Sequence, residues 1–289
     1  MREFTILSGK GGAGKTTVAA AIASLAPNAI FCDNDVDAAD LHLILKPEIK
    51  ENYQFDSGTI AEINTEICTD CGLCVEYCRF DAIHYNNAGQ LYVNPHQCEG
   101  CRLCERICPV QAITSHQNTN NNWYVSDTRF GTLVHAKMGP GEENSGKLVS
   151  CIREKARQLA TETNADYIIN DGSPGIGCPV IASVTGTDVV LLVIEPSLTG
   201  IHDAERLYKL VQSFNIPAFA LINKFDINTE ITKQAEIFLQ KNDIPLIGKI
   251  PFDTKFVESM VEGKTIIEYL PGSDLTKIFE QAWQSLNNA

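Results

Sequence analysis

Residues 4–17 have the sequence FTILSGKGGAGKTT, an apolar run followed by a glycine-rich loop. The loop fits the pattern G-x4-G-K-[ST], whose fixed positions are Gly9, Gly14, Lys15 and Thr16. Glycines allow backbone N–H groups to turn inward around phosphate oxygens, and a helix N-terminus adds a favourable dipole. An apolar helical stretch follows at residues 18–25. Strand, glycine loop and helix in this order predict a P-loop that binds a nucleotide.

The loop residues have distinct expected roles. We expect Lys15 to contact the β- and γ-phosphates and the Thr16 hydroxyl to bind Mg²⁺. The predicted nucleotide-binding positions of the loop are Gly9, Gly11, Gly12, Ala13, Gly14, Lys15, Thr16 and Thr17. The ligand that this loop predicts is a nucleoside triphosphate with Mg²⁺.

An acidic segment follows the apolar run at residues 29–32, which predicts a buried strand. Its carboxylates are Asp33, Asp35 and Asp37. Ligands of an open α/β sheet bind outside the carboxyl ends of its strands, where carboxylates can hold Mg²⁺-bound water and orient an attacking water. For Asp37 and Asp40, N-capping of a short helix at residues 41–45 is an open alternative.

A second strand end carries a similar segment. The apolar run at residues 167–170 is followed by DGSPG, from Asp171 to Gly175. By itself this string is a turn signal. Directly after a strand, in a chain that also has a P-loop, it indicates a second loop on the phosphate side.

The lysine at the second position of the glycine loop adds a family resemblance. With Lys10 in the string GKGGAGKT, the sequence resembles the deviant Walker ATPases that include MinD, ParA and the nitrogenase iron protein. This resemblance implies that Lys10 reaches the phosphates of a partner chain in a homodimer formed on ATP binding, or in a heterodimer with a paralogue. The alternative is a solvated loop lysine.

The same resemblance assigns roles to the strand-end residues. It implies that Asp33 and Asp35 belong to switch I, that Asp171 lies beside Mg²⁺-bound water, and that the Gly175 N–H senses the γ-phosphate. The expected catalytic set is Lys10, Lys15, Asp33, Asp35 and Asp171.

Base recognition is expected at two later strand ends. Residues 223–226 read NKFD, which fits the N-K-x-D motif that reads guanine in GTPases. In the resembling family the asparagine at this strand end contacts adenine instead, and PFD at residues 251–253 looks like a second base-side element. The resemblance therefore favours ATP or ADP over GTP, with contacts from Asn223, Pro251 and Asp253.

Eight of the 11 cysteines lie between positions 68 and 108 and form the pattern C-x2-C-x2-C-x3-C twice. The first set is Cys68, Cys71, Cys74 and Cys78, and the second is Cys98, Cys101, Cys104 and Cys108. Each cysteine of the second set lies 30 residues after its counterpart, which indicates an internal duplication. Three thiolates at this spacing can wrap one [4Fe-4S] cluster while the fourth points to a second cluster.

The expected ligand sets are therefore crossed. One cluster is assigned to Cys68, Cys71, Cys74 and Cys108, and the other to Cys98, Cys101, Cys104 and Cys78. The alternative is zinc, which usually takes paired C-x2-C knuckles. Residues 60–117 resemble bacterial-type two-cluster ferredoxins, with Arg79 in place of the proline that often follows the fourth cysteine.

Apolar runs alternate with helical patterns along the rest of the chain, which predicts an α/β fold with a mostly parallel sheet and helices on both faces. The helical patterns are at residues 146–162, 202–214, 229–241, 254–262 and 274–286. The alternating stretch at residues 123–135 is expected to return the chain to the sheet. The predicted organisation is a P-loop ATPase domain, residues 1–59 and 118–289, interrupted by a small α+β ferredoxin-like domain, residues 60–117.

The formal charge is -13, with 36 acidic and 23 basic residues. Such a balance disfavours nucleic acid as a partner, because phosphate binding depends on Lys and Arg. The apolar face of residues 274–286 has a single basic residue, Lys277, so we expect it to pack on the core rather than on a membrane. Clustered reduced thiols and the absence of a visible leader predict a cytoplasmic location.

Three functions remain open. The first is an ATPase that couples nucleotide state to electron transfer with an unidentified redox protein through the two clusters. The second is a cluster carrier or scaffold that resembles Mrp-type ATPases. The third is a positioning or regulatory ATPase of the MinD or ParA kind. Cys178, shortly after Asp171, is either a helix-start residue or a ligand of a cluster shared between subunits.

Overall fold

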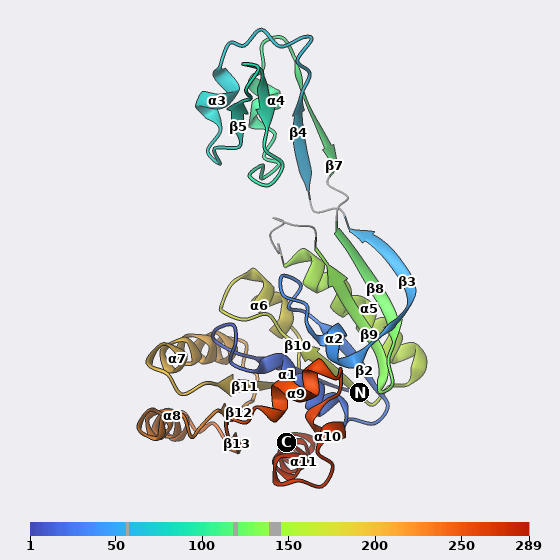
Figure 1. The fold of residues 1–289 in the computed structure, drawn as a ribbon, viewed down its shortest axis with the longest axis vertical. Helices are drawn as coiled ribbons and strands as arrows, with labels where there is room; N and C mark the ends of the chain where they lie inside the picture. Colours follow the sequence, from blue (N-terminus) through green and yellow to red (C-terminus); the bar gives the residue numbers. More distant parts are fainter. Residues whose placement is uncertain (56–57, 118–120, 139–145, 289) are drawn as a thin grey trace. The chain divides into compact units, whose positions relative to one another are not determined.

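The computed structural model describes residues 1–55, 58–117, 121–138 and 146–288 (Figure 1). The chain forms two compact units. The P-loop unit comprises Met1–Asn52, Trp123–Ala136 and Asn144–Ala289, and the cysteine unit comprises Tyr53–Asn122 and Lys137–Glu143. The cysteine unit interrupts the sequence of the P-loop unit and includes the predicted insertion, residues 60–117. No helix of the described residues is both long enough and apolar enough to cross a bilayer.

A nine-stranded sheet, in the order β13-β12-β11-β1-β10-β2-β9-β8-β3, organises the P-loop unit. The strands are β1 (Arg2–Leu7), β2 (Ala29–Asp33), β3 (Glu48–Phe55), β8 (Asn121–Asp127), β9 (Gly131–Lys137), β10 (Tyr167–Asp171), β11 (Val189–Ile194), β12 (Ala218–Asn223) and β13 (Leu246–Ile250). All neighbours from β13 to β9 are parallel. The prediction of a mostly parallel sheet is confirmed.

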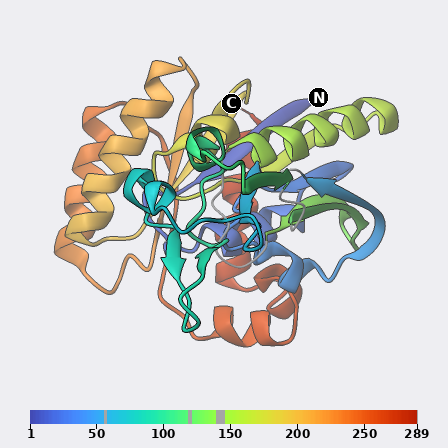
Figure 2. The ribbon, with the colours of Figure 1, turned by 90° about the horizontal axis from the view of Figure 1, so that it is seen from above.

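Helices cover both faces of this sheet, as predicted. Along β1, Phe4 and Ile6 face a layer formed by α1 (Lys15–Ala23), α2 (Leu41–Leu45), α9 (Lys255–Val261), α10 (Ile266–Tyr269) and α11 (Asp274–Asn287). Leu7 faces the other way, toward α6 (Cys178–Val184), α7 (Leu198–Ser213) and α8 (Thr229–Lys241). Figure 2 shows the red helices α9–α11 on one side of the strands and the yellow-green α5 (Lys147–Thr163) on the other. This alternation of side chains follows from the pleat of a strand.

The sequence patterns place most elements within a few residues of their observed bounds. Helix α7 begins at Leu198 rather than at residue 202, because the Ser197 hydroxyl accepts the Gly200 N–H at 3.1 Å and caps the helix. The predicted return over residues 123–135 is the hairpin of β8 and β9. Strand β3 lies at the edge of the sheet and carries no apolar run, so the sequence pattern did not predict it. The sequence also offers Ser145 as a cap for the helix predicted at residues 146–162, and this residue lies outside the described residues.

The C-terminal helix α11 packs on the core, as expected. Its buried side chains are Leu275, Thr276, Phe279, Ala282, Trp283 and Leu286. Trp283 also makes edge contacts with the rings of Phe4 and Tyr167, at centroid distances of 5.7 and 5.0 Å. The apolar face of this helix is therefore covered by the protein's own chain.

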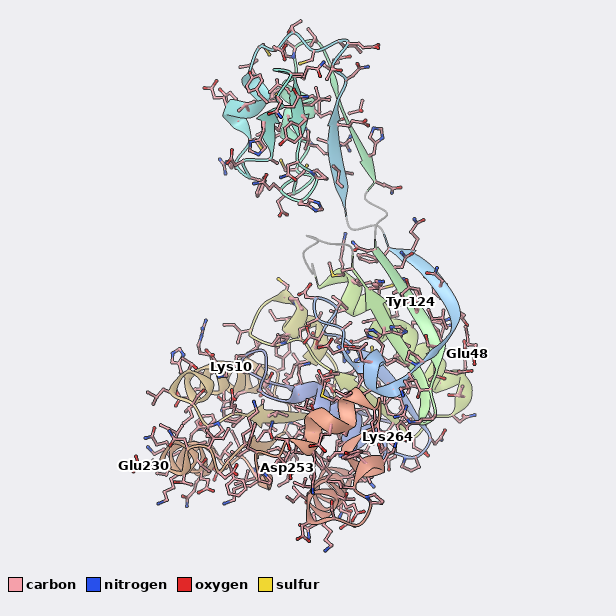
Figure 3. The ribbon with its side chains drawn as sticks, in the orientation of Figure 1. Lys10, Glu48, Tyr124, Glu230, Asp253 and Lys264 are labelled. Carbon is pink, nitrogen blue, oxygen red and sulfur yellow. The ribbon has the colours of Figure 1, made fainter. Side chains whose placement is uncertain are left out.

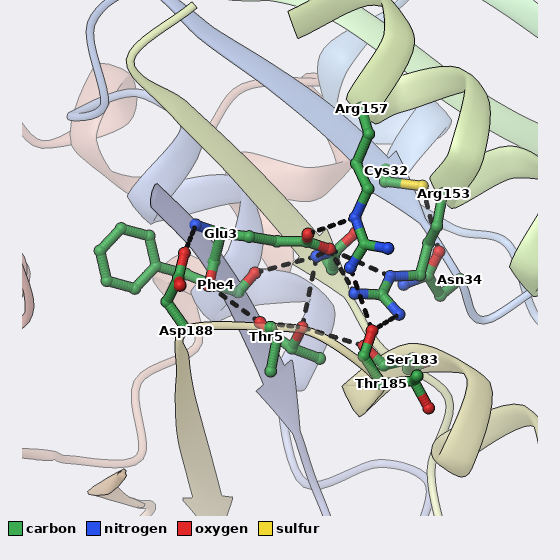
Figure 4. Close-up of polar contacts among 12 residues, drawn as sticks. Glu3, Phe4, Thr5, Cys32, Asn34, Arg153, Arg157, Ser183, Thr185 and Asp188 are labelled. Atoms are coloured by element: carbon green, nitrogen blue, oxygen red, sulfur yellow. Dashed lines mark hydrogen bonds and ion pairs between the residues drawn. The ribbon is translucent and has the colours of Figure 1, made fainter. Parts of the chain in front are cut away.

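A buried ion network joins β1 to α5 (Figure 4). Both carboxylate oxygens of Glu3 accept hydrogen bonds from arginines of α5: Arg153 binds one and Arg157 the other, the latter at 2.7 Å. Asn170 donates to the same carboxylate at 2.9 Å. Arg153 also donates to the Ala182 and Thr185 carbonyls at the end of α6. One carboxylate therefore fixes α5 and α6 on the sheet.

The described residues of the cysteine unit form two short antiparallel strand pairs and two short helices. The elements are β4 (Thr59–Ile63) with β7 (Ile113–Gln117), β5 (Ile83–Tyr85) with β6 (Leu91–Val93), α3 (Leu73–Tyr77) and α4 (Leu103–Ile107). A small core of Ala61, Cys74, Ile83, Leu91 and Ile113 holds them together.

The duplication seen in the sequence extends to the backbone of this unit. Left-handed residues recur at equivalent positions of the two halves: Asp70 and Gly100 (φ 52° and 62°), Gly72 and Arg102 (75° and 60°), and Asp81 and Gln111 (50° and 52°). Non-glycine residues seldom adopt positive φ, so this recurrence indicates one turn geometry used twice. Arg79 therefore does not alter the turn that Pro109 occupies in the second half.

Candidate functional site

The glycine loop connects β1 to α1, as the sequence predicts. Lys15 is the first residue of α1, and Gly12 and Gly14 adopt positive φ values of 78° and 92°. A Cβ at Gly14 would collide with the Asn223 amide, so this position requires glycine. Thr16 and Thr17 follow in the first turn of the helix. The loop thus presents its backbone beside the N-terminus of α1, where an anion is favoured.

Carboxylates from two neighbouring strands converge on Lys15. Its ammonium lies 2.6 Å from Oδ1 of Asp171 and 3.2 Å from Oδ2 of Asp35. Asp33 and Asp171 are opposite each other in the register of β2 and β10, and both are fully buried. The structure therefore brings together all four of these predicted catalytic residues.

The charges in this cluster are unbalanced. Burial and the Asp171 carboxylate raise the pKa of Asp33 well above its usual range, against the pull of Lys15. Burial also raises the pKa of Asp35. For Lys15, burial disfavours the charged form, but Asp171 and Asp35 outweigh it and raise the pKa of the ammonium. Repulsion among the three carboxyl groups around one ammonium favours additional positive charge or hydrogen-bond donors beside them.

A specific atom in the cluster is suited to bind Mg²⁺-bound water. Within the described part of the chain, Oδ2 of Asp171 is buried and has no hydrogen-bond partner. Buried polar atoms are nearly always satisfied, so an unpaired carboxylate oxygen indicates a missing donor. This observation fits the expectation that Asp171 and the Thr16 hydroxyl would hold a hydrated Mg²⁺.

Asp33 also has a structural role. Its Oδ2 accepts the N–H of Leu41, the first residue of α2, at 3.2 Å. Asp40 stands at the N-cap position but its side chain makes no capping bond. The capping considered for Asp40 is thus supplied by Asp33, a more distant carboxylate.

Gly175 is tied to the phosphate loop. Its N–H, predicted to sense the γ-phosphate, donates to the Ser8 carbonyl at 3.1 Å, and its φ is 90°. The loop after β10 and the start of the P-loop are therefore joined by a backbone hydrogen bond in this structure.

A pocket beside the P-loop contains all three predicted base-contact residues. Its lining includes Gly12, Thr17, Asn223, Pro251, Phe252, Asp253, Phe256 and Met260. Asn223 donates its amide N–H to the Ala13 carbonyl at 2.8 Å, which leaves its amide oxygen as an acceptor. Asp253, labelled in Figure 3, is also among the residues that line this pocket.

The aspartate of the N-K-x-D string has a different task. Oδ1 of Asp226 accepts the backbone N–H of Phe252 at 2.7 Å and so fixes the loop that carries Pro251 and Asp253. Oδ1 of Asp226 therefore has a structural role in the loop beside the pocket, which is consistent with the expectation that the pocket takes adenine.

Base selectivity can be tested with two variants. We expect Asn223→Ala to weaken ATP binding by about tenfold, because one hydrogen bond to the base and one to the P-loop are lost. Asp226→Asn retains an acceptor for the Phe252 N–H and should change ATP binding by less than about twofold. Calorimetric titration with ATP and GTP measures both. A large loss of GTP binding confined to Asp226→Asn would contradict the adenine assignment.

Strand pairing in the cysteine unit brings the predicted ligand sets together. Strand β4 leads to Cys68 and pairs with β7, which follows Cys108; Asn64 donates to the Ala112 carbonyl at 2.8 Å. Strand β6 leads to Cys98 and pairs with β5, which follows Cys78; Asn94 donates to the Ala82 carbonyl at 2.7 Å. Each pairing thus joins the segment that follows a fourth cysteine to the segment that leads to the triplet of the other half.

A cavity in this unit is lined by one complete predicted set. Its walls include Cys78, Cys98, Cys101 and Cys104, together with Tyr77, Phe80 and Leu103. Burial raises the pKa of Cys104 to about 11, and Cys98, Cys101 and Cys78 act on it in the same direction. Four thiolates here need a compensating positive core. The donor set fits a [4Fe-4S] cluster.

The fourth cysteine of each set receives a backbone hydrogen bond. The Ala82 N–H donates to Sγ of Cys78 at 3.4 Å, and the Ala112 N–H donates to Sγ of Cys108 at 3.2 Å. Hydrogen bonds to sulfur ligands are one determinant of cluster potential.

In the part of the chain that the structure describes, no group of three His, Cys, Asp or Glu side chains could hold a single metal ion.

Comparison with known proteins identifies the family. A family model, the CobQ/CobB/MinD/ParA nucleotide binding domain, matches residues 4–266. The chain belongs to this family. It is 34% identical over 229 residues to the uncharacterized protein MJ0578 of Methanocaldococcus jannaschii, with 78% of this chain and 79% of that protein covered.

The fold of this CobQ/CobB/MinD/ParA member is that of a MinD-like P-loop NTPase. The septum site-determining protein MinD of Pyrococcus horikoshii, solved with Mg-ADP, superposes with a TM-score of 0.60 at 17% identity, covering 99% of this chain and 96% of that one. A ferredoxin of Streptomyces griseus is 40% identical over 60 residues, which are 20% of this chain and 56% of the ferredoxin.

One residue of this family member, Glu195, escaped the sequence analysis. Glu195 ends the apolar run of β11, and its carboxylate binds Lys10 at 2.8 Å and Lys224 at 2.9 Å. A carboxylate at the end of a buried strand was a signal of the same kind as Asp33 and Asp171. Cys178, considered as a cluster ligand, is exposed at the start of α6.

Proposed function

We propose that this protein is an ATP-hydrolysing iron–sulfur protein that dimerises on ATP and couples its nucleotide state to electron transfer. The observation that supports the proposal is the pairing of β4 with β7 and of β5 with β6, which joins the segment before Cys68 to the segment after Cys108 and the segment after Cys78 to the segment before Cys98, in a chain with a complete P-loop. The electron partner is a second protein.

The nucleotide chemistry rests on Lys15 and its carboxylates. When bound, Mg²⁺ neutralises phosphate charge and supplies ordered water. Lys15 binds the β- and γ-phosphate oxygens after exchanging its contacts with Asp171 and Asp35. Asp35, the less buried of the two switch I carboxylates, accepts a hydrogen bond from the attacking water and orients it. Asn223, Pro251 and Asp253 hold the adenine.

The electron-transfer side rests on the eight cysteines. When bound, two [4Fe-4S] clusters accept and donate single electrons. The Ala82 and Ala112 N–H groups hydrogen-bond to Cys78 and Cys108 and stabilise their thiolates. Tyr77, Phe80 and Leu103, which are 54%, 44% and 37% exposed, line the same cavity as the second set. Cys101 of this set is itself exposed, so a partner protein can approach the set from the surface of the unit.

Redox coupling is tested by measuring ATP-dependent dimerisation with the clusters oxidised and reduced, and the cluster potential with and without ATP. We expect the concentration of ATP for half-maximal dimerisation to differ between oxidised and reduced protein, and the cluster potential to shift with ATP. The two effects are linked: a tenfold change in ATP response corresponds to about 60 mV for a one-electron couple. Potentiometry and sedimentation measure them.

Two variants make this test specific. Lys10→Ala should abolish ATP-dependent dimerisation and the potential shift while the cluster absorbance is kept. Lys233→Ala, an exposed lysine of α8, is the control and should resemble the wild type. If dimerisation of the wild type does not depend on the cluster redox state and the cluster potential does not depend on ATP, the proposed redox coupling is wrong. Rapid cluster transfer to an apo-ferredoxin would instead favour the carrier function.

A further inference from the structure

The side chain of Lys10 is held within its own chain. Its ammonium forms an ion pair with Oε2 of Glu195 at 2.8 Å and donates to the Ser197 hydroxyl at 3.0 Å. Glu195 follows β11 directly, and Ser197 is the N-cap of α7. Lys10 therefore spans from the P-loop to the start of the neighbouring helix.

The main chain around Lys10 is fixed as well. A Cβ at Gly9 would lie 2.6 Å from the Asp203 backbone and 2.9 Å from the Ala204 nitrogen, so the start of the P-loop packs directly on α7. Ser8 donates its hydroxyl to the Lys10 carbonyl at 2.8 Å. This packing directs Lys10 toward Glu195 and Ser197.

Glu195 holds a second lysine at the same time. Its other carboxylate oxygen, Oε1, lies 2.9 Å from the ammonium of Lys224, which also donates to the Gly12 carbonyl at 3.2 Å. The Glu195 carboxylate thus binds both Lys10, which belongs to the P-loop, and Lys224, which contacts it. The hydrogen bonds from Lys10 and Lys224 overcome the effect of burial and lower the pKa of Glu195, so it is charged at neutral pH.

We propose that Glu195 is a latch that holds Lys10 inside its own chain, and that ATP-dependent dimerisation requires this contact to open. The inference rests on the proposed dimerisation, in which Lys10 reaches the partner's phosphates. A lysine bound to Glu195 of its own chain cannot bind phosphate across the interface. Glu195 therefore competes with the partner's nucleotide for the same ammonium.

The arrangement favours reversible opening. The side chains of Lys10, Glu195 and Lys224 are 32%, 22% and 27% exposed, so solvent screens the ion pairs. When Lys10 leaves, Glu195 keeps Lys224 as its counter-ion and is not left as an unpaired charge. Ser197 likewise keeps the Gly200 N–H of its cap. The free energy needed to break the Lys10–Glu195 contact is therefore only that of a partly exposed ion pair.

Glu195→Gln tests the latch, because the amide keeps the shape and loses the charge. We expect the variant to need about two- to fivefold less ATP for half-maximal dimerisation, the range for a partly exposed ion pair. Without nucleotide, acylation of Lys10 by an amine reagent, followed by mass spectrometry, should be faster by a similar factor. Ser197→Ala is unsuitable, because it also removes the cap of α7.

Glu236→Gln is the matched control. Glu236 forms a partly exposed ion pair with Lys249 at 3.0 Å, on α8 and away from the P-loop. It should leave both measurements unchanged.

The outcomes separate the latch from the proposed function. If Lys10→Ala abolishes dimerisation but Glu195→Gln changes neither the ATP requirement nor the reactivity of Lys10, the latch is wrong and the proposed function stands. If Glu195→Gln dimerises with ATP and the wild type does not, the latch is supported in its strongest form. If neither chain dimerises with ATP at any concentration, both the latch and the dimerisation are refuted.

Discussion

Replacing Glu3 by Gln is expected to lower the free energy of unfolding by about 3–5 kcal/mol, the cost of leaving a buried charge without its partner. Arg153 is 3% exposed and has Glu3 as its ion-pair partner, and its guanidinium also donates to the Ala182 and Thr185 carbonyls. Burial lowers the pKa of Arg153, and Glu3 opposes that effect. The neutral amide removes this compensation.

Chemical denaturation measures the change, with Glu236→Gln as the control. That substitution removes a partly exposed pair with Lys249 and should cost at most about 1 kcal/mol. The double variant Glu3→Leu/Arg153→Met should recover much of the loss, because a packed apolar pair has no charge to solvate. A loss below about 1 kcal/mol in Glu3→Gln would show that the network contributes little.

The expected damage extends beyond stability. The Arg153 guanidinium binds the carbonyls at the end of α6, and α6 begins shortly after Asp171 and Gly175. Loss of its counter-ion should therefore loosen the helix that follows the phosphate-side loop. Hydrogen exchange of α6 should increase more than that of α8, which has no bond to this network in the described structure.

The sequence predicted the elements whose signals are local. Strands β1, β2, β10, β11, β12 and β13 are apolar runs, and the P-loop lies where its spacing placed it. The repeated cysteine spacing also anticipated the duplicated backbone of the cysteine unit, seen in the matched φ values of Asp81 and Gln111. Apolar periodicity and fixed spacing are properties of a short stretch of sequence, so they can be recognised without knowledge of the tertiary structure.

Features that depend on distant residues escaped the sequence. Glu3 is a charged residue in a strand, and its burial depends on arginines of α5 that are remote in the chain. The contact between Lys10 and Glu195 joins two loops that no local pattern connects. Strand β3 pairs at the sheet edge with mostly exposed side chains, where an apolar run is not required.

Gly100→Ala is expected to remove one cluster and keep the other. Gly100 lies between Cys98 and Cys101, has a φ of 62°, and would place a Cβ against the backbone of Thr59. Its counterpart in the first half, Asp70, has a side chain at nearly the same φ, 52°. The turn itself therefore tolerates a side chain. The close packing on Thr59 is what requires glycine at position 100.

The loop that carries two ligands of the second set must move away from Thr59 in this variant. Iron content should fall from about eight to about four atoms per chain, because Cys68, Cys71, Cys74 and Cys108 are not disturbed. Iron analysis and electron paramagnetic resonance of the reduced protein measure the loss, and the spin–spin coupling between two reduced clusters should disappear. ATP binding should not change, because the P-loop unit has its own core.

Gly89→Ala is the matched control, since Gly89 has a φ of 76° and a Cβ at this position would meet no atom within 4 Å. It carries the backbone cost of a left-handed alanine, about 1–2 kcal/mol, without the collision. Both clusters should be retained. If Gly100→Ala also keeps about eight iron atoms, Thr59 does not fix the ligand loop. If it loses all of them, the two sets do not assemble independently, and the crossed pairing of β4 with β7 would explain why one half needs the other.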